Sequence, residues 1–207
     1  MKARVAILLS GRGSNFLALQ AAIARGAIPA EIVLVLSNRK SAAGLRSAAE
    51  LGLPTLCLPH GEAPSREAHD ERVVAALAAA AAEWICLAGY MRLLSPVFVR
   101  AFPRRILNVH PSLLPAFPGL HAQRQALEHG VRVSGCTVHL VDEELDHGPI
   151  VEQRAVPVRS GDTEETLADR ILVQEHRAYP EALRRLLTRR WTIVGRRVVF
   201  ARSRSAG

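Results

Sequence analysis

The chain lacks the cysteine and histidine patterns of disulfide-stabilised and metal-binding proteins. Its 207 residues include three cysteines, Cys57, Cys86 and Cys136, which lie far apart and form no Cys-x-x-Cys pair. Disulfide frameworks and structural zinc sites rely on paired or closely spaced cysteines. The histidines other than His110 also lack the tight spacing of metal ligands. We therefore expect buried, reduced thiols and no metal site.

A long apolar run and a signal peptide are also missing. The most apolar stretch, residues 73–91, is mostly alanine and is interrupted by Glu83, so it divides better into a helix and a short strand than into a membrane span. The N-terminus runs directly into the strand-like residues 5–9, without the regions of a secretion signal. These features predict a cytoplasmic protein with no membrane partner.

Aromatic residues are scarce, at 4%, whereas positive charge is in excess, with a formal net charge of +8. Such a balance permits RNA contact. However, no aromatic residues interleave with the arginines of the C-terminal segment, so we interpret that segment as a solvated basic face and expect no nucleic-acid partner. Its arginines are Arg184, Arg185, Arg189, Arg190, Arg196, Arg197, Arg202 and Arg204. Their field would also attract anionic small molecules.

The first half of the chain alternates between strand-like and helical segments. Helices are predicted at about 15–25, 41–51, 67–83 and 96–101. Strands are predicted at 4–9, 32–36, 54–58, 84–88 and 106–110. Strands that alternate with helices are typical of a parallel sheet with helices on both faces, so this half is expected to be α/β and Rossmann-like.

The second half has a different order of elements. A β run at 134–141 and a strand at 150–156 are predicted to pair antiparallel through a loop that contains Asp146. The other predicted elements are helices at about 122–129 and 164–187 and a hairpin at 191–200. No linker or repeat divides the chain, so we expect a single domain over residues 1–207. Its parts are residues 1–100, 101–187 and a short basic terminal hairpin, 188–207.

A glycine-rich loop, Gly11-Arg12-Gly13-Ser14-Asn15, falls between the first strand and the first helix. Unpaired amides and the positive end of a helix N-terminus favour an anion there. Phe16 replaces the third glycine of the dinucleotide fingerprint, and the Gly-Lys-Ser/Thr of a P-loop is absent, which disfavours NAD and ATP. The loop is a candidate phosphate site, and the alternative is that its glycines only satisfy backbone geometry.

Two polar residues end an otherwise apolar strand. Asn108 and His110 lie in the run 106–110, where residues i and i+2 point to the same face, and Pro111 stops the strand. Strand ends of this kind carry the ligand crevice of parallel sheets. Asp146 can add a carboxylate from its loop, and the three groups together suit the transfer of a one-carbon acyl unit. The alternative is that Asn108 caps a turn and His110 is a satisfied core histidine.

The run Asn108-Val109-His110-Pro111-Ser112-Leu113-Leu114-Pro115, with Leu145-Asp146-His147-Gly148-Pro149, resembles the formyltransferases that use 10-formyltetrahydrofolate. Three further runs are similar to the branch of that family that formylates glycinamide ribonucleotide in purine synthesis. They are Gly11-Arg12-Gly13-Ser14-Asn15, Ala88-Gly89-Tyr90-Met91-Arg92-Leu93-Leu94-Ser95-Pro96 and Gln174-Glu175-His176-Arg177-Ala178-Tyr179-Pro180. The resemblance spans residues 3 to about 187.

The resemblance implies an enzyme with two small-molecule substrates, 10-formyltetrahydrofolate as co-substrate, no metal, and a monomeric or homodimeric state. Its implied catalytic residues are Asn108, His110 and Asp146. The implied ribonucleotide site comprises Gly13, Ser14 and Asn15 for the phosphate and Glu175 for the glycinamide end. The implied folate site comprises Arg66, Met91, Arg92, Leu93, Leu94, Asn108, Val141 and Asp142. Residues 1–100 would then be the phosphate-binding half, and 101–187 the catalytic and folate-binding half.

Several alternatives stay open. Glu175 and Arg66 can instead be solvated surface charges. Methionyl-tRNA formyltransferases share the Asn/His/Asp chemistry but continue into an extra C-terminal β domain, and formyltetrahydrofolate hydrolases usually add an N-terminal regulatory domain. A non-enzymatic phosphate-binding α/β module would not need the three catalytic residues together. Ala116 and His147 depart from the residues common in the family, and both departures bear on affinity or pH dependence.

Overall fold

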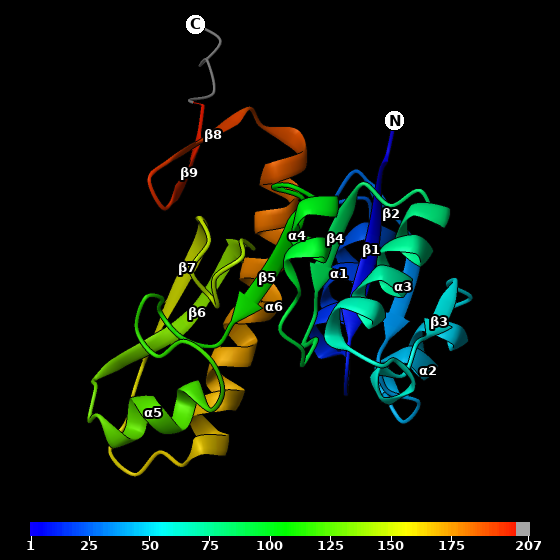
Figure 1. The fold of residues 1–207 in the computed structure, drawn as a ribbon. Coiled ribbons are helices and arrows are strands. Elements are labelled where there is room, and N and C mark those ends of the chain that lie inside the picture. Colours follow the sequence, from blue (N-terminus) through cyan, green and yellow to red (C-terminus); the bar gives the residue numbers. More distant parts are fainter. Residues whose placement is uncertain (202–207) are drawn as a thin grey trace, which may run out of the picture.

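The computed structural model of the protein describes residues 1–201, which are built around one nine-stranded sheet (Figure 1). The strand order is β3-β2-β1-β4-β5-β6-β7-β9-β8. The strands are β1 (Ala3–Leu9), β2 (Ala30–Ser37), β3 (Thr55–Cys57), β4 (Trp84–Leu87), β5 (Ile106–His110), β6 (Val133–Leu140), β7 (Ile150–Pro157), β8 (Trp191–Val194) and β9 (Arg197–Phe200). The helices are α1 (Ser14–Ala24), α2 (Ala43–Glu50), the 3-10 helix η1 (His60–Glu62), α3 (Arg66–Ala79), α4 (Pro96–Ala101), α5 (Ala122–Glu128) and α6 (Glu164–Thr188).

The sheet changes direction at β6. Strands β3, β2, β1, β4 and β5 are all parallel, whereas β6 pairs antiparallel with both β5 and β7. The terminal hairpin then extends the same sheet, with β9 parallel to β7 and antiparallel to β8. This arrangement confirms the predicted mostly parallel α/β fold with an antiparallel C-terminal part.

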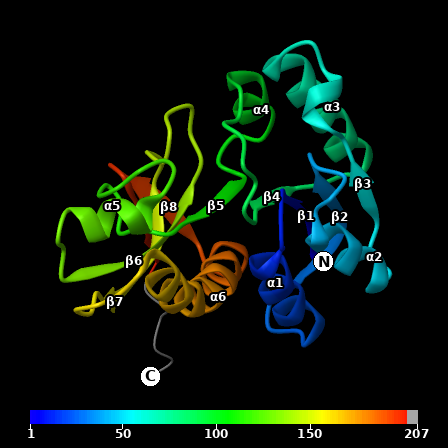
Figure 2. The ribbon, with the colours of Figure 1, turned by 90° about the horizontal axis from the view of Figure 1, so that it is seen from below.

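Helices cover both faces of the sheet, as expected (Figure 2). In β1, Ile7 and Leu9 pack in the cluster that includes α1 and α6, while Ala6 and Leu8 pack in the cluster that includes α3 and α4. Successive side chains of a strand point to opposite faces, so a strand that is apolar throughout fills both layers. The continuous apolar run of β1 is therefore explained by its burial on two sides.

Some boundaries differ from those expected. The helix predicted to continue to residue 83 ends at Ala79, because Ala81 adopts a left-handed φ of 49° and the Ala82 amide donates to the Leu77 carbonyl at 3.0 Å. This is the bonding of a helix C-cap, which usually employs glycine. Conversely, Pro180 lies inside α6 without ending it. The predicted hairpin at 191–200 is present, and the part of segment 188–207 beyond residue 201 lies outside the described residues.

The cysteines are free thiols. Burial raises the pKa of both Cys86 and Cys136 to about 12, which makes them inert at neutral pH. Cys57 is only half-buried, so the expectation of burial was wrong for that residue. In the described part of the chain, no helix combines the length and apolarity needed to cross a membrane.

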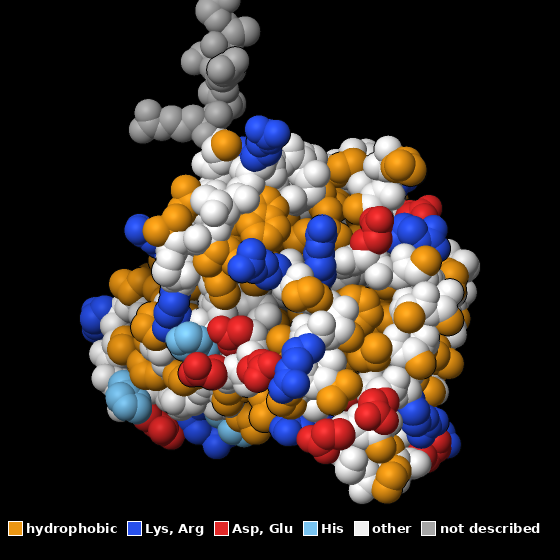
Figure 3. Space-filling model, turned by 45° about the horizontal axis from the view of Figure 1, so that its top comes forward, with side chains coloured by type: hydrophobic (Ala, Val, Ile, Leu, Met, Phe, Trp, Pro, Cys, Tyr) orange, Lys and Arg blue, Asp and Glu red, His pale blue; other side chains and the backbone are white. Residues whose placement is uncertain are grey.

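The arginine-rich C-terminal segment is not uniformly solvated. Arg184 pairs with Glu181 at 2.8 Å, and Arg185 pairs with Glu152 at 2.6 Å while its guanidinium stacks on the Phe200 ring at 4.0 Å. The expectation of a solvated basic face was therefore wrong for Arg185, whose side chain is mostly covered, whereas Arg184 stays exposed and Arg202 and Arg204 lie outside the described residues. On the face seen in Figure 3, basic, acidic and apolar side chains are interspersed.

Tyr179→Phe is expected to lower the free energy of unfolding by about 1–2 kcal/mol. The buried Tyr179 hydroxyl lies 2.8 Å from the Leu107 carbonyl and 3.1 Å from the Leu87 carbonyl, so it ties α6 to β5 and β4. Urea denaturation would measure the loss. Val173→Ala, at an exposed position of the same helix, is expected to change the value by less than about 0.5 kcal/mol. An unchanged value for Tyr179→Phe would contradict the role of this hydroxyl.

Candidate active site

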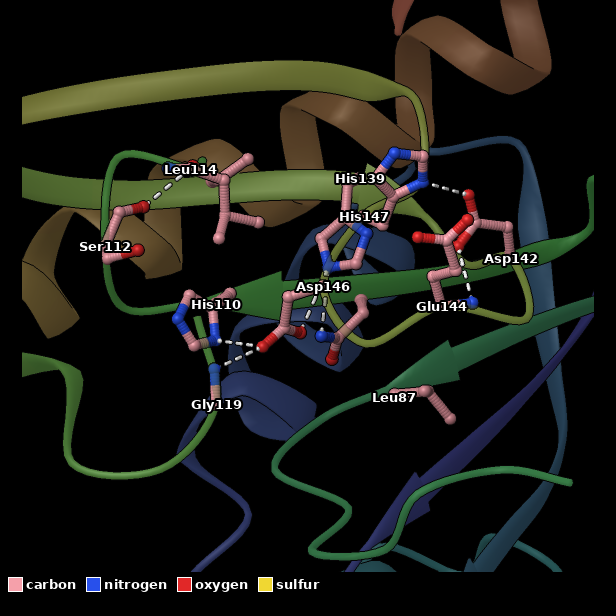
Figure 4. Close-up of polar contacts among 12 residues, drawn as sticks. Leu87, His110, Ser112, Leu114, Gly119, His139, Asp142, Glu144, Asp146 and His147 are labelled. Carbon is pink, nitrogen blue, oxygen red and sulfur yellow. Dashed lines mark hydrogen bonds and ion pairs between the residues drawn. The ribbon is translucent and has the colours of Figure 1, made fainter. Parts of the chain in front are cut away.

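The end of β5 brings the predicted catalytic residues together, and Figure 4 shows the contact between two of them, His110 and Asp146. His110 is the last residue of the strand and is buried, and Asn108 is half-buried two residues before it. Asp146 reaches His110 from the loop between β6 and β7, with 3.3 Å between its Oδ2 and the imidazole Nδ1. An amide, an imidazole and a carboxylate thus lie at one edge of the sheet, where strand carboxyl ends form ligand crevices.

Both ring nitrogens of His110 face hydrogen-bond acceptors. Nδ1 faces the Asp146 carboxylate, and Nε2 lies 2.9 Å from the Phe117 carbonyl oxygen. The His110 and Asp146 side chains are 7% and 8% exposed, so water competes little for these contacts. A carbonyl only accepts, so Nε2 carries a hydrogen.

Asp146 is held in an uncommon backbone conformation. Its φ is 51°, in the left-handed region that few residues other than glycine adopt. Its Oδ2 accepts a hydrogen bond from the Gly119 amide at 2.8 Å in addition to facing His110. Conformations of this kind persist when the surroundings fix them. The carboxylate therefore joins β5, the loop that carries Gly119, and its own loop.

His139, one of the histidines without the spacing of metal ligands, completes the site. It lies on β6 directly opposite Asn108, and the Asn108 Nδ2 is 3.2 Å from its Nε2. Its Nδ1 lies 3.1 Å from the Leu140 carbonyl and must donate to it, which leaves Nε2 to accept from Asn108. Burial lowers the pKa of His139, which keeps the ring neutral. In the sequence, His139 is marked only by its position in an apolar strand. That position does not reveal which residue of the neighbouring strand it faces.

Three of the four residues predicted for the ribonucleotide lie at the start of α1, and the fourth, Glu175, contacts them from α6. Gly13 has a φ of 78° and directly precedes the helix, and Ser14 and Asn15 form its first turn. The Asn15 Nδ2 donates to the Glu175 Oε2 at 2.6 Å, both side chains being buried. Burial raises the pKa of the Glu175 carboxyl, and the hydrogen bond from Asn15 opposes that shift.

Gly13 also has a packing role. A Cβ there would come within 2.7 Å of the Gly44 Cα, so the two glycines allow α1 and α2 to approach. At Gly13, glycine is therefore needed for the close packing of the backbone, as the alternative interpretation of this loop expects. It does not exclude an anion, because the helix N-terminus still presents amides to one.

The segment after β4 is the second region of predicted ligand contacts. Met91 and Leu93 are 59% and 50% exposed and so present apolar surface to solvent, whereas Leu94 is buried in the core. The buried Nε of Arg92 has no hydrogen-bond partner within the described chain. Ser10, which the sequence did not single out, accepts from the Met91 amide at 2.8 Å and so fixes the start of this segment.

The remaining predicted folate residues divide into two groups. The Val141 amide donates to the Ile106 carbonyl at 2.9 Å, and the Asp142 Oδ2 pairs with the His147 Nδ1 at 3.0 Å, so both residues belong to the Asp146 loop region. Arg66 begins α3, where its guanidinium pairs with Glu67 at 3.2 Å. Within residues 1–201, no hydrogen bond or ion pair joins Arg66 to the other predicted site residues.

A metal centre was not expected from the sequence. Across residues 1–201, no three His, Cys, Asp or Glu side chains are grouped so that they could hold a metal ion. The side chains at the end of β5 are hydrogen-bond donors and proton carriers. Such a set can stabilise a developing oxyanion and move a proton.

The chain is similar to several known proteins, and residues 3–183 match the formyl transferase family. It is 44% identical over 205 residues to phosphoribosylglycinamide formyltransferase of Mycobacterium tuberculosis, which covers 99% of this chain and 94% of the relative. A glycinamide ribonucleotide transformylase 1 from Symbiobacterium toebii has a similar structure, with a TM-score of 0.94, 50% identity, and coverage of 96% of this chain and 94% of that one.

Another relative is much longer than this chain. The trifunctional purine biosynthetic protein adenosine-3 of Drosophila pseudoobscura pseudoobscura is 54% identical over 182 residues. The match covers 87% of this chain but only 13% of the relative. The chain therefore corresponds to one part of that protein.

The neutral state of His139 makes stability depend on pH in a defined direction. Because burial lowers its pKa below the ordinary value of 6.5, the unfolded chain binds a proton that the folded chain does not. This contribution to stability is fully present above pH 6.5 and is lost as the pH falls towards the lower folded pKa. In His139→Gln, the fall in unfolding free energy between about pH 7 and about pH 5 is expected to be smaller than in the parent chain. Equal pH slopes in urea denaturation would contradict the neutral ring.

Proposed function

Because the chain belongs to the formyl transferase family, we propose that it transfers the formyl group of 10-formyltetrahydrofolate to the amine of glycinamide ribonucleotide. The products are formylglycinamide ribonucleotide and tetrahydrofolate, and the reaction serves purine synthesis in the cytoplasm. The observation that carries the proposal is the contact of His110 with Asp146 beside Asn108. The relatives matched over nearly their full length are also named for this reaction.

The ribonucleotide binds at the start of α1 in this proposal. Its phosphate lies against the amides of Gly13, Ser14 and Asn15, where the helix N-terminus favours an anion. Glu175 accepts from the glycinamide end, and Asn15 holds its carboxylate at 2.6 Å for that purpose. A buried polar pair of this kind orients a substrate because it has few alternative partners.

The folate binds beside the exposed residues of the segment after β4. Met91 and Leu93 offer apolar surface to the pterin, and Arg92 offers a guanidinium that suits a carboxylate. Asp142 and Val141 border the same ligand from the Asp146 loop. Arg66 contributes at the outer end of this site, where it would exchange its Glu67 partner for a folate carboxylate.

Asn108 and His110 stabilise the oxyanion that forms when the amine attacks the formyl carbon. One hydrogen of the Asn108 amide is directed to His139 at 3.2 Å, and the other is left for the oxygen. His110 donates through Nε2, which contacts the Phe117 carbonyl at 2.9 Å. The formyl oxygen has to replace that carbonyl, so substrate binding is coupled to a shift of the Phe117 segment.

Asp146 has two roles in the proton transfer of this reaction. Its carboxylate, 3.3 Å from the His110 Nδ1, stabilises the protonated ring that the oxyanion requires. As the tetrahedral intermediate collapses, the proton lost by the attacking amine has to reach the departing folate nitrogen. Asp146 accepts and returns that proton through water, which is the work of a general base and acid.

The purified chain is expected to form tetrahydrofolate from 10-formyltetrahydrofolate only when glycinamide ribonucleotide is present. Parallel reactions without acceptor and with initiator methionyl-tRNA serve as controls. Turnover without acceptor would identify a hydrolase, and transfer only to the tRNA would identify the related transferase. Folate binding without any turnover would indicate a binding module that catalyses no reaction. Each of these three results would overturn the proposal.

Asp146→Asn is expected to lower kcat by at least about 100-fold, the usual range for a lost acid-base group. The KM for the ribonucleotide is expected to change little, because the proposed binding groups lie at α1 and Glu175. Steady-state kinetics with each substrate varied would separate the two effects. Glu143→Gln is a matched control, since Glu143 lies in the same loop but pairs with Arg100 on the surface. Equal losses of turnover and ribonucleotide affinity would contradict the proton role.

A further inference from the structure

The terminal hairpin reaches the loop that carries Asp146. Strand β9 lies beside β7 in the sheet, with Arg197 in register with Ile150 (Figure 1). The Ile150 amide donates to the Arg196 carbonyl at 2.8 Å. Residue 150 is the first of β7, so the hairpin docks where the Asp146 loop rejoins the sheet. A segment distant in the sequence is thus placed next to the catalytic loop.

The Arg196 side chain contacts the loop itself. Its Nε donates to the main-chain carbonyl of His147 at 2.7 Å, and His147 directly follows Asp146. Arg196 is half-buried, and a hydrogen bond from a guanidinium is stronger than one between neutral groups. The carbonyl is a main-chain group, so the contact fixes the backbone path of the loop. It does not depend on which side chain follows Asp146.

The loop needs such a constraint because its geometry is demanding. Asp146 has its left-handed φ of 51°. Two residues later, a Cβ on Gly148 would collide with the Leu140 carbonyl oxygen, so only glycine fits the close approach. Within the loop, the His147 Nδ1 pairs with the Asp142 Oδ2 at 3.0 Å (Figure 4). This pair closes the loop on itself, but it does not tie the loop to the sheet.

The hairpin does not need the Arg196 side chain for its own attachment. Val198 is buried in the main core. Phe200 stacks under the Arg185 guanidinium at 4.0 Å. The hydrogen bond from Ile150 uses the main chain of Arg196 and is independent of its side chain. Removal of the Arg196 guanidinium therefore leaves the hairpin in place and releases the loop alone.

We propose that Arg196 is a positioning residue for Asp146, acting through the His147 carbonyl to keep the Asp146 carboxylate against His110. The proposal rests on the proposed function, because it assigns the hairpin a part in the same transfer reaction. It also gives one arginine of the C-terminal segment a specific role in place of a solvated charge. Loss of the guanidinium lets Asp146 move within its loop, and small displacements of catalytic groups cost much of the rate.

The test compares Arg196→Ala with Arg197→Ala and Arg196→Lys in the full chain. Arg197 is the adjacent exposed arginine of β9 and controls for charge and for hairpin stability. Arg196→Ala is expected to lower kcat by about 10- to 100-fold, with the ribonucleotide KM within about 2-fold of the parent value. Arg197→Ala is expected to keep the parent kcat. Arg196→Lys is expected to restore part of the rate, since an ammonium also donates to a carbonyl.

Hydrogen exchange gives a readout that does not depend on turnover. Amides of residues 142–148 are expected to exchange faster in Arg196→Ala than in Arg197→Ala, while those of β9 keep the same rate. Unchanged exchange in the loop, or an unchanged kcat, would overturn the proposal. Equal losses of kcat in the two alanine variants would also overturn it. If the parent chain shows no ribonucleotide-dependent turnover, the proposed function fails, and the exchange rates alone decide whether Arg196 holds the loop.

Discussion

The contact between the Asp146 carboxylate and the His110 imidazole is the constraint on which the site depends. It joins a residue fixed by a strand to a residue carried by a loop, across 3.3 Å and with little solvent access. A buried carboxylate is costly without partners, and the left-handed backbone of Asp146 is kept only by its surroundings. The Gly119 amide, the His110 ring and the β6–β7 loop must therefore be in place together.

The parallel part of the sheet explains why distant segments meet at one edge. Strands β1, β4 and β5 are neighbours and run in the same direction, so their carboxyl ends lie side by side. The loop at Gly13 follows β1, the segment at Met91 follows β4, and His110 ends β5. The residues proposed for the phosphate, for the folate and for catalysis are thus adjacent for a single topological reason. Strand β6 runs antiparallel to β5 and ends at Leu140, opposite Leu107, and the loop that follows folds back so that the Asp146 carboxylate lies 3.3 Å from the His110 imidazole.

The sequence predicted what depends on local pattern. Alternation of strands and helices predicted the α/β fold, the period of two placed Asn108 beside His110, and the motif resemblance predicted the family to which the chain belongs. It gave His139 no catalytic role, because the β6 residue that faces Asn108 depends on the register between β5 and β6, which the sequence does not reveal. Arg196 was also missed, since its partner is a carbonyl and carries no sequence signal.

The acceptors around Asn108 and His110 decide which of their atoms can serve the reaction. His139 is neutral and carries its hydrogen on Nδ1, so its Nε2 turns the amide nitrogen of Asn108, rather than the oxygen, towards the site. The Phe117 carbonyl, 2.9 Å from the His110 Nε2, can only accept, so that nitrogen also carries a hydrogen. Two side chains that can both donate and accept are thereby made donors. In the proposed reaction the Phe117 carbonyl has to leave His110 when the formyl oxygen binds, so the reorganisation accompanies substrate binding, and both donors are in place before charge develops on the oxygen.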